Sequence, residues 1–323
     1  MLYPLKFKPR YKERVWGGNN LEQIFGKKLP DNKHIGESWE LSTLEGDDSQ
    51  VAEGRLEDND LSELIEVFMG DLVGDSVYAK FGLEFPVLVK FLDVSESLSV
   101  QVHPDNAIAA ERHGCMGKTE MWYIIDAQEG SRIGLGFKPG VTLEMYEQAL
   151  AMGEVENLLN IIEVFKGDCF LIPAGTVHFI GGGILLAEIQ QTSDITYRVY
   201  DWGREGVAGK MRELHTDLAA EAMNFDTSAM RLCVTKPPMV NNPVNIVNSE
   251  HFVTQLLKVE GEMLRDYLTL DSFVIYVCVE GSAMLNDTPI KVGETVLIPA
   301  MYERLNIKGD AILLETFMTI DTE

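Results

Sequence analysis

Four residues of this sequence have side chains that bind divalent metal ions, and their setting favours one shared site: Gln101, His103, Glu120 and His178. Two of them belong to residues 98–103, where aliphatic residues alternate with Ser99, Gln101 and His103, which predicts a strand. Because alternate side chains of a strand point to the same face, the hydroxyl, the amide and the imidazole lie side by side. This combination is unusual on a core face and suits a pocket that holds a cation.

The other two ligand candidates also occupy strand-like segments. Glu120 opens the apolar run 120–125, and His178 follows a Pro-x-Gly turn at residues 173–175. Neutral imidazole and carboxylate groups suit zinc, with iron or manganese as alternatives. The amide of Gln101 leaves the site less negative than a second carboxylate would, so open positions on the metal can accept substrate oxygens. Taken singly, each residue also fits an ordinary hydrogen-bonded or solvated side chain; their combination favours one divalent metal ion, with Zn²⁺ first among the candidates.

Short apolar strands separated by turns are predicted to position these ligands. From residue 85 onward they fall at 86–93, 97–103, 120–126, 168–172, 177–180, 184–191 and 195–201. Helical patterns fall at 59–82, 105–113, 142–163 and 215–223. The proline- and asparagine-rich stretch 237–243 indicates a boundary. We therefore predict a first domain at residues 1–236, with N-terminal strands and helical segments, and a second domain at 237–323.

An internal repeat suggests that the two domains are related. Residues 167–174 resemble residues 293–300 at an offset of 126, and residues 129–131 match 280–282 at an offset of 151. A helical insertion in the first copy, near 142–163, accounts for the difference between the two offsets. We therefore predict two related β-barrels. At these offsets His178 falls opposite Arg304 and Glu120 opposite Asp271, and no histidine follows His251. The second barrel is therefore predicted to be metal-free.

Composition narrows the class of protein. The chain has 323 residues, 46% of them hydrophobic, which is typical of a globular protein. Its formal net charge of −24 argues against binding to nucleic acid or to anionic membranes, although local lysines and arginines can still bind an anionic substrate. The sequence contains neither a signal-peptide pattern nor an apolar run that approaches the roughly 18 residues of a membrane span. Its four cysteines lack Cys-x-x-Cys spacing and are predicted to be reduced thiols of a cytoplasmic protein.

Several motifs resemble those of a known family. They are FLD at 91–93, LSVQVHPD at 98–105, GKTEMWY at 117–123, AGTVH at 174–178, EIQQ at 188–191 and SDITYRVYDW at 193–202. Together with residues 16–18 and 36–40, they resemble the short bacterial branch of type I mannose-6-phosphate isomerases, in the cupin superfamily. The resemblance extends over nearly the whole chain. It implies a mainly β fold with two cupin-like (jelly-roll) barrels and helical insertions in and around the first.

The resemblance also implies an activity, a metal and a set of site residues. The activity is the zinc-dependent interconversion of mannose 6-phosphate and fructose 6-phosphate. The metal ligands are carried over onto Gln101, His103, Glu120 and His178, and active-site roles onto Ser99, Lys118, Glu188 and Arg198. The chain departs from the longer members of the family at two positions, where Gly117 replaces a histidine and Ile180 replaces a tyrosine. It also lacks their extra helical domain.

Aldose–ketose isomerisation needs a base, groups that stabilise a developing enolate oxygen, and residues that bind the phosphate. Glu188 is the candidate base, because it shares one strand face with Ile184, Leu186 and Gln190; a structural ion pair is the alternative. Arg198 is expected to stabilise the enediolate or to hold phosphate. Lys118 and Ser99 are the expected phosphate partners. The sequence does not decide whether Glu188, Lys118 or a metal-bound water carries the proton. Asp201 and Trp202 could belong to the active site or could simply pack at the end of a strand.

Two other classes of protein compete with the isomerase. A metal-dependent cupin dioxygenase would often show a His-x-His motif where this chain has Gln101 and His103, and it would not require Lys118 and Arg198. A non-catalytic sugar-binding cupin would be expected to lose the metal ligands or the inward Glu188 and Arg198. Both sets persist in this sequence, so the isomerase is favoured.

Overall fold

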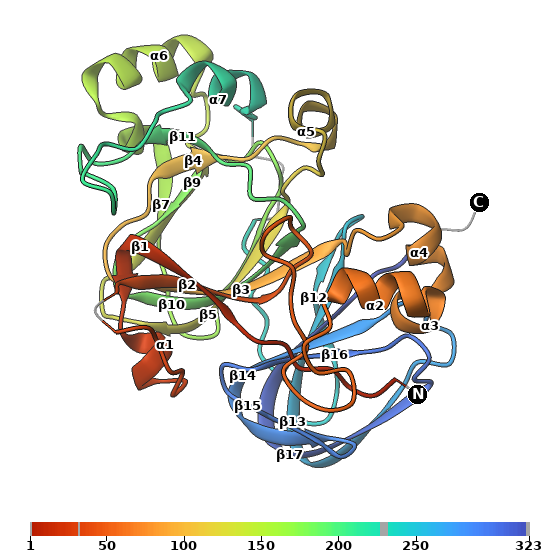
Figure 1. Cartoon of the computed structure of the whole chain (residues 1–323). Helices are drawn as coiled ribbons and strands as arrows, with labels where there is room; N and C mark the ends of the chain where they lie inside the picture. Colours follow the sequence, from red (N-terminus) through yellow and green to blue (C-terminus); the bar gives the residue numbers. More distant parts are fainter. Residues whose placement is uncertain (1, 32, 227–231, 321–323) are drawn as a thin grey trace. The chain divides into compact units, whose positions relative to one another are not determined.

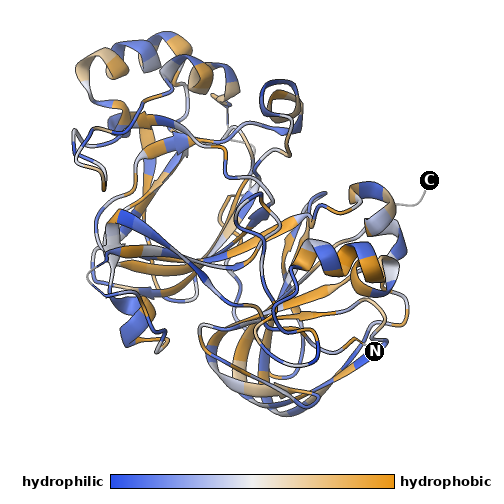
Figure 2. Cartoon of the chain, viewed as in Figure 1, coloured by the Kyte–Doolittle hydropathy of each residue, from blue (hydrophilic) through white to orange (hydrophobic). Residues whose placement is uncertain are grey.

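The computed structural model describes residues 2–31, 33–226 and 232–320 and shows a mainly β protein, as the sequence predicts (Figure 1). Strands in the described part form three sheets whose strand pairs are largely antiparallel. Hydrophobic residues gather along the strands, where they alternate with hydrophilic ones (Figure 2), as expected for strands with one buried face. Within the same described ranges, every helix is too short or too polar to cross a membrane.

The first two sheets pack face to face. One has the order β1 (Arg10–Gly18), β2 (Ile35–Leu41), β3 (Val87–Val94), β10 (Ile184–Gln191), β5 (Glu120–Ala127) and β8 (Cys169–Ile172). The other has the order β11 (Tyr197–Tyr200), β4 (Val100–Val102), β9 (His178–Ile180), β6 (Arg132–Phe137) and β7 (Leu159–Glu163). Trp122 and Ile124 from the first sheet share a buried cluster with Ile133 and Ile180 from the second. This shared core fixes the inner faces on which the predicted ligands lie.

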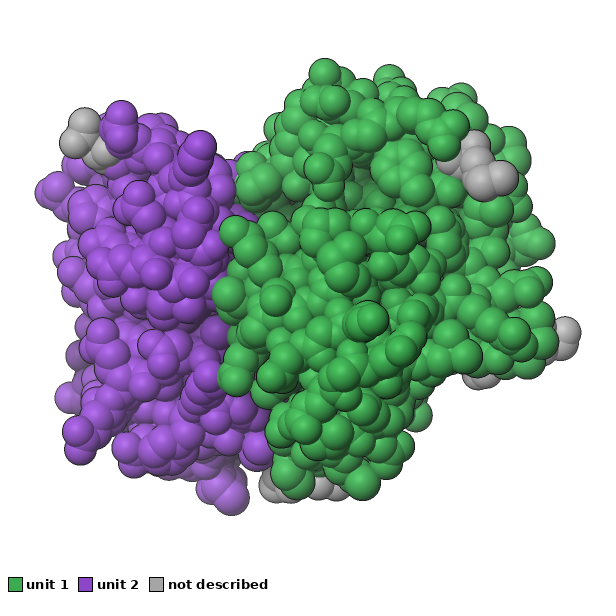
Figure 3. All heavy atoms as spheres, turned by 90° about the horizontal axis from the view of Figure 1, so that it is seen from below, with its two compact units in different colours: residues 1–10, 39–90, 236–323 green, residues 11–38, 91–235 purple. Residues whose placement is uncertain are grey.

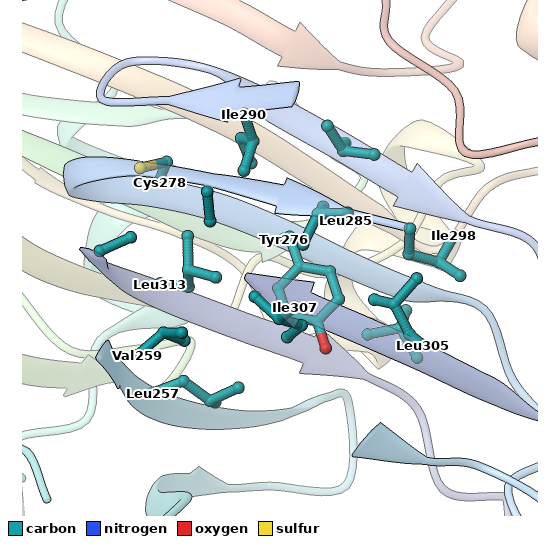
Figure 4. Close-up of a cluster of buried hydrophobic side chains, with 14 of the residues drawn as sticks. Leu257, Val259, Tyr276, Cys278, Leu285, Ile290, Ile298, Leu305, Ile307 and Leu313 are labelled. Carbon is teal, nitrogen blue, oxygen red and sulfur yellow. The ribbon is translucent and has the colours of Figure 1, made fainter. Parts of the chain in front are cut away.

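The third sheet is formed by the C-terminal strands. It runs β12 (Val244–Asn248), β13 (Val253–Asp266), β17 (Arg304–Phe317), β14 (Val274–Leu285) and β15 (Thr288–Lys291), with β16 (Thr295–Ile298) paired to β14. Every second residue at the start of β14 is buried in one cluster: Val274, Tyr276 and Cys278. Figure 4 shows Tyr276 among the aliphatic side chains of this cluster. A dense core of its own therefore holds this sheet.

Three helices replace the single predicted helix at 59–82. They are α2 (Leu61–Phe68), α3 (Gly70–Val73) and α4 (Asp75–Phe81). The breaks fall at Met69, with φ of 45°, and at Gly74, with φ of 98°, because a left-handed residue cannot continue a right-handed helix. Of these two break positions, only Gly74 is a residue type that indicates a helix end in the sequence.

The helical prediction at 142–163 is correct in its first half and wrong in its second. Helix α6 (Leu143–Met152) ends at Gly153, which has φ of 70°, and is followed by the short helix η1 (Val155–Leu158). Residues Leu159–Glu163 then form strand β7, which pairs with β6. The left-handed glycine ends the helix, and pairing with a neighbouring strand decides the conformation that follows.

The other predicted helices are present in the structure. They are α5 (Asn106–His113) and α7 (Thr216–Ala222), and a short helix α1 (Asn20–Gln23) follows β1. Contacts divide the chain into two compact units, shown in Figure 3, which comprise residues 1–10, 39–90 and 236–323, and residues 11–38 and 91–235. Residues 39–90, which the sequence analysis placed in the first domain, thus group with the C-terminal residues. For example, Ala300 donates a backbone hydrogen bond to Leu72.

The predicted repeat has a structural counterpart. In the first copy, Trp122 pairs with Phe170 on β8 and with Glu188 on β10. In the second, Tyr276 pairs with Val296 on β16 and with Glu315 on β17. This register makes Val274, not Asp271, the counterpart of Glu120, because Glu120 pairs with Ile172 and Val274 with Ile298. The second copy therefore has an aliphatic side chain at the position that corresponds to Glu120.

Candidate metal centre

Three predicted ligands converge on one point inside the unit formed by residues 11–38 and 91–235. Glu120 opens β5, His178 opens β9, and His103 directly follows β4. The Nε2 atom of His103 lies 3.4 Å from one carboxylate oxygen of Glu120, and Nε2 of His178 lies 3.3 Å from the other. One ligand atom from each of the three lies within 4.8 Å of the others, and all three side chains are buried. This arrangement can hold a divalent metal ion.

Both imidazoles are oriented for metal binding by their second nitrogen. Nδ1 of His178 is 2.8 Å from the carbonyl oxygen of Thr176, and Nδ1 of His103 is 2.9 Å from that of Ile195. A carbonyl can only accept, so each Nδ1 carries the proton and each Nε2 presents its lone pair toward Glu120. Burial lowers the pKa of His178 to about 4. The imidazole is therefore neutral near pH 7, which is the form that binds metal.

Gln101 adjoins the cluster and fits as a fourth ligand. It is the direct cross-strand neighbour of His178, and its Nε2 lies 3.2 Å from Nε2 of His178. Its Oε1 accepts a hydrogen bond of 3.3 Å from the hydroxyl of Ser99. The two ends of an amide exchange by rotation of the group. The rotated amide would direct its oxygen toward the metal position and its NH₂ toward Ser99, whose hydroxyl can also accept.

The loop before Glu120 is fastened by side-chain amides that the sequence analysis left without a role. Gln191 accepts a hydrogen bond of 2.9 Å from the backbone of Thr119 and donates one of 2.9 Å to Asn106. Asn106 in turn accepts from the backbone of Gly117. A Cβ atom on Gly117 would lie 2.6 Å from the backbone nitrogen of Asn106. The close approach explains why glycine occupies this position.

Lys118 leaves this loop toward the metal ligands. Its ammonium lies 3.5 Å from Oε2 of Glu120, and the residue is only 5% exposed. A buried ammonium beside a ligand carboxylate balances part of the negative charge at the site. Ser99, which is also buried, contacts Gln101 as described above. Two of the three predicted substrate-binding residues, Lys118 and Ser99, therefore lie beside the ligand cluster.

Glu188 projects from the inner face of the same strand pair. Glu188 lies opposite Trp122, and Gln190 lies opposite Glu120. The indole nitrogen of Trp122 donates a hydrogen bond of 3.0 Å to the Glu188 carboxylate, and the indole ring meets the ring of His178 edge-on at 5.3 Å between centroids. Trp122 thus connects the candidate base to a metal ligand. The sequence signal for this role was alternation, since residues 120 and 122 share a face.

Arg198 lies on the other wall of the site. It is the cross-strand neighbour of Gln101, so the two side chains share a face. Its Nη1 donates a hydrogen bond of 3.0 Å to the carbonyl of Glu213, and its backbone nitrogen donates to Nδ1 of His215. Burial, followed by the charge of the nearby Arg212, lowers the pKa of Arg198.

Fold and site together define a mainly β protein with a buried cluster of two histidines and one glutamate, beside a glutamine, that can hold a divalent metal ion. The family model for the catalytic domain of type I phosphomannose isomerase matches residues 4–135. The mannose-6-phosphate isomerase ManA of Bacillus subtilis is 42% identical over 224 residues, which are 68% of each chain. A putative mannose-6-phosphate isomerase of the same organism, YvyI, is 34% identical over 96% of this chain and 98% of its own.

A solved structure agrees with these relatives. The mannose 6-phosphate isomerase from Bacillus subtilis superposes with a TM-score of 0.84 and 33% identity, over 98% of this chain and 99% of that chain. The chain belongs to the type I mannose-6-phosphate isomerase family. The resemblance stated from the sequence motifs is confirmed, and the comparisons do not favour the dioxygenase or the non-catalytic cupin.

Proposed function

We propose that this protein interconverts D-mannose 6-phosphate and D-fructose 6-phosphate with one divalent metal ion held by Gln101, His103, Glu120 and His178. The observation that carries the proposal is the convergence of His103, Glu120 and His178 within 4.8 Å. It occurs in a chain whose relatives are named mannose-6-phosphate isomerases. The neighbouring Lys118 and Glu188 supply the cation and the carboxylate that aldose–ketose isomerisation needs.

Zinc is the metal that we propose. Two neutral imidazoles, a carboxylate and an amide oxygen form a mixed nitrogen and oxygen donor set, which suits zinc. When bound, the ion supplies Lewis acidity to the oxygens of the two reacting carbons. The carbonyls of Thr176 and Ile195 orient the two imidazoles, and burial, which lowers the pKa of His178, keeps that imidazole neutral near pH 7. The protein also fixes the loop before Glu120 through Gln191.

We assign the proton transfer to Glu188. It is the diagonal neighbour of Glu120 on the inner face of β5 and β10, and such neighbours lie roughly 7 Å apart. This separation leaves room for two sugar carbons between the carboxylate and the metal ligands. The hydrogen bond from Trp122 fixes the orientation of the carboxylate. Glu188 then takes a proton from one carbon and returns it to the other through a cis-enediol.

The contacts of Lys118 and Ser99 with predicted metal ligands support a role for both at the reacting end of the sugar. The Lys118 ammonium lies 3.5 Å from Glu120, and the Ser99 hydroxyl lies 3.3 Å from Gln101. An ammonium in this position stabilises negative charge that develops on the enediol oxygens. The hydroxyl can donate to or accept from a sugar oxygen. Arg198, on the opposite wall, is assigned to the anionic part of the substrate.

We propose further that the sheets close into two cupin-like β-barrels. The first two sheets, with α5, α6 and α7 as helical insertions, form the catalytic barrel, and the third sheet forms a metal-free one. The shared core of the first two sheets and the repeated pairing of Trp122 with Glu188 and of Tyr276 with Glu315 support this reading. All four cysteines are free, which fits a cytoplasmic protein that acts on a small-molecule sugar phosphate.

A coupled assay for fructose 6-phosphate formed from mannose 6-phosphate, with metal analysis of the same sample, tests the proposal. We expect turnover and one metal ion per chain. His178→Ala should lose both metal and activity, whereas Arg198→Ala should keep the metal and lose activity. Absence of turnover in the metal-loaded wild type would contradict the proposed function. Normal turnover of the Arg198→Ala variant would show that Arg198 does not have the role assigned to it.

A further inference from the structure

Residues 117–119 form the loop that leads into β5, and all three of their backbone N–H groups donate hydrogen bonds. The first donates to the side-chain oxygen of Asn106 and the third to that of Gln191, each at 2.9 Å. The second donates to the carbonyl of Pro104 at 3.1 Å, and Pro104 directly follows the predicted ligand His103. Two side-chain amides and the segment of one predicted ligand therefore fix this loop.

Gln191 is the buried one of the two amides. It is 4% exposed, whereas Asn106 is exposed to solvent. Its side chain also donates a hydrogen bond of 2.9 Å to Asn106, and its backbone nitrogen donates one of 3.1 Å to the carbonyl of Thr119. Thr119 is buried as well, and its hydroxyl accepts from the backbone of Ala174, in the turn before His178. Because water replaces a lost partner least readily at a buried site, the contact between Gln191 and Thr119 matters most for the loop.

Glu120 and Lys118 are held by different means, although they lie two residues apart. Glu120 is paired on both sides in the sheet, with Gln190 on β10 and with Ile172 on β8. Lys118 lies before the strand, so the position of its ammonium, 3.5 Å from Oε2 of Glu120, depends on the conformation of the loop. Loss of a contact in the loop should therefore displace Lys118 while the metal ligand stays in place.

We propose that Gln191 is a positioning residue, which holds the Lys118 ammonium beside the metal centre through the backbone of Thr119. This inference rests on the proposed function, in which Lys118 stabilises negative charge on the enediol oxygens, and it deepens that function. When Gln191 loses its amide oxygen, a buried N–H group is left without an acceptor, so the loop should rearrange. A displaced ammonium stabilises the transition state less, which lowers kcat more than it changes KM.

Steady-state kinetics of Gln191→Met, with metal analysis of the same sample, test this assignment. Methionine has nearly the same shape as glutamine but lacks the amide. We expect kcat for mannose 6-phosphate to fall by about tenfold or more, while KM changes far less and the metal content stays at the wild-type value. A double-mutant cycle shows whether Gln191 acts through Lys118. Lys118→Met removes the ammonium, so Gln191→Met should not lower kcat further in that background.

Two variants of Asn106 and one control complete the series. Asn106→Ala should lower kcat less than Gln191→Met, because water can replace an exposed partner. Asn106→Asp should retain the wild-type kcat, because both contacts of Asn106 are accepted by its side-chain oxygen. Asn306→Ala removes an amide hydrogen bond of 2.7 Å to Glu262 in the third sheet and should leave kcat unchanged.

The outcomes separate this inference from the proposed function. If the wild type isomerises mannose 6-phosphate and the folded, metal-loaded Gln191→Met enzyme keeps its kcat, or loses the same factor with and without Lys118, the positioning role is wrong and the function stands.

Chemical labelling of Lys118 tests the positioning without any activity. The buried ammonium of the wild type should react slowly with a small acylating reagent, as measured by peptide mass spectrometry. Gln191→Met should raise that rate by about tenfold or more, while the exposed Lys28 reacts equally in both proteins. If the wild type does not isomerise, faster labelling of Lys118 in the variant still supports its positioning by Gln191, and equal labelling overturns it.

Discussion

Glu188 accepts a hydrogen bond of 3.0 Å from the indole nitrogen of Trp122, its direct neighbour across the β10–β5 pair. The second copy of the repeat keeps this arrangement with other residues, since Glu315 accepts from the hydroxyl of Tyr276. In the first copy the carboxylate lies beside metal ligands, and in the second it lies beside Arg265. The same pairing therefore adjoins the candidate metal centre in one place and a buried ion pair in the other.

Trp122→Phe should impair catalysis without releasing the metal. The change removes the donor to Glu188 but leaves Glu120, His103 and His178 intact. A hydrogen bond to a charged group contributes about 1.5–3 kcal/mol, and because this one orients the proposed base, kcat should fall by about tenfold or more. Steady-state kinetics and metal analysis on the same sample check this.

Tyr276→Phe is the matched control for that change. It removes the equivalent hydrogen bond in the second copy and should lower the free energy of unfolding while kcat stays at the wild-type value. A Trp122→Phe enzyme with unchanged kcat would show that this hydrogen bond has no catalytic role.

The metal-free protein should lose stability as the pH falls. Burial lowers the pKa of His178 from 6.5 to about 4, so between these values the unfolded chain binds a proton that the folded chain does not. The stabilisation is therefore fully present above pH 6.5 and is lost progressively as the pH falls toward 4. A shift of this size corresponds to roughly 3 kcal/mol. Urea unfolding of chelator-treated protein at several pH values measures it.

The control for this pH dependence is His178→Asn, which should show a shallower decline over the same window. Identical pH profiles for the two metal-free proteins would mean that another group controls acid unfolding.

Arg265→Ala should destabilise the third sheet strongly. The guanidinium donates two hydrogen bonds, of 2.9 and 2.7 Å, to the fully buried carboxylate of Glu315, which also accepts from Tyr267 and Tyr276. Removing the cation leaves a buried charge uncompensated, which costs about 3–5 kcal/mol. Chemical denaturation measures the loss. Arg304→Ala removes an exposed arginine near Asp266 and should change stability by less than about 1 kcal/mol. Equal effects of the two substitutions would contradict this account of Glu315.

The convergence of His103, Glu120 and His178 could be expected from the sequence because alternation and turn residues act locally. Alternation alone assigns Glu120 to the inner face of its strand, and the Pro-x-Gly turn marks the start of the strand that carries His178. The structure brings these residues together with His103, as expected for one metal site. The roles of Glu188 and Arg198 remain predictions that the geometry accommodates.

Other features of the site depend on which residues pair across neighbouring strands, and the sequence alone does not predict this register. Trp122 gains its role only because Glu188 lies opposite it, and Gln191 because it meets the backbone of Thr119, 72 residues away. Likewise β7 follows a helical pattern in the sequence but pairs with β6. Such features depend on contacts between distant segments, which local periodicity does not encode.

Restoring activity to the chelated protein with zinc tests the central claim most directly. Mannose 6-phosphate isomerase activity should be absent after chelation and should rise linearly with added Zn²⁺ until one equivalent per chain is bound. The His178→Ala protein should stay inactive throughout the same titration. Full activity in chelated wild type that contains far less than one metal ion per chain would contradict the account.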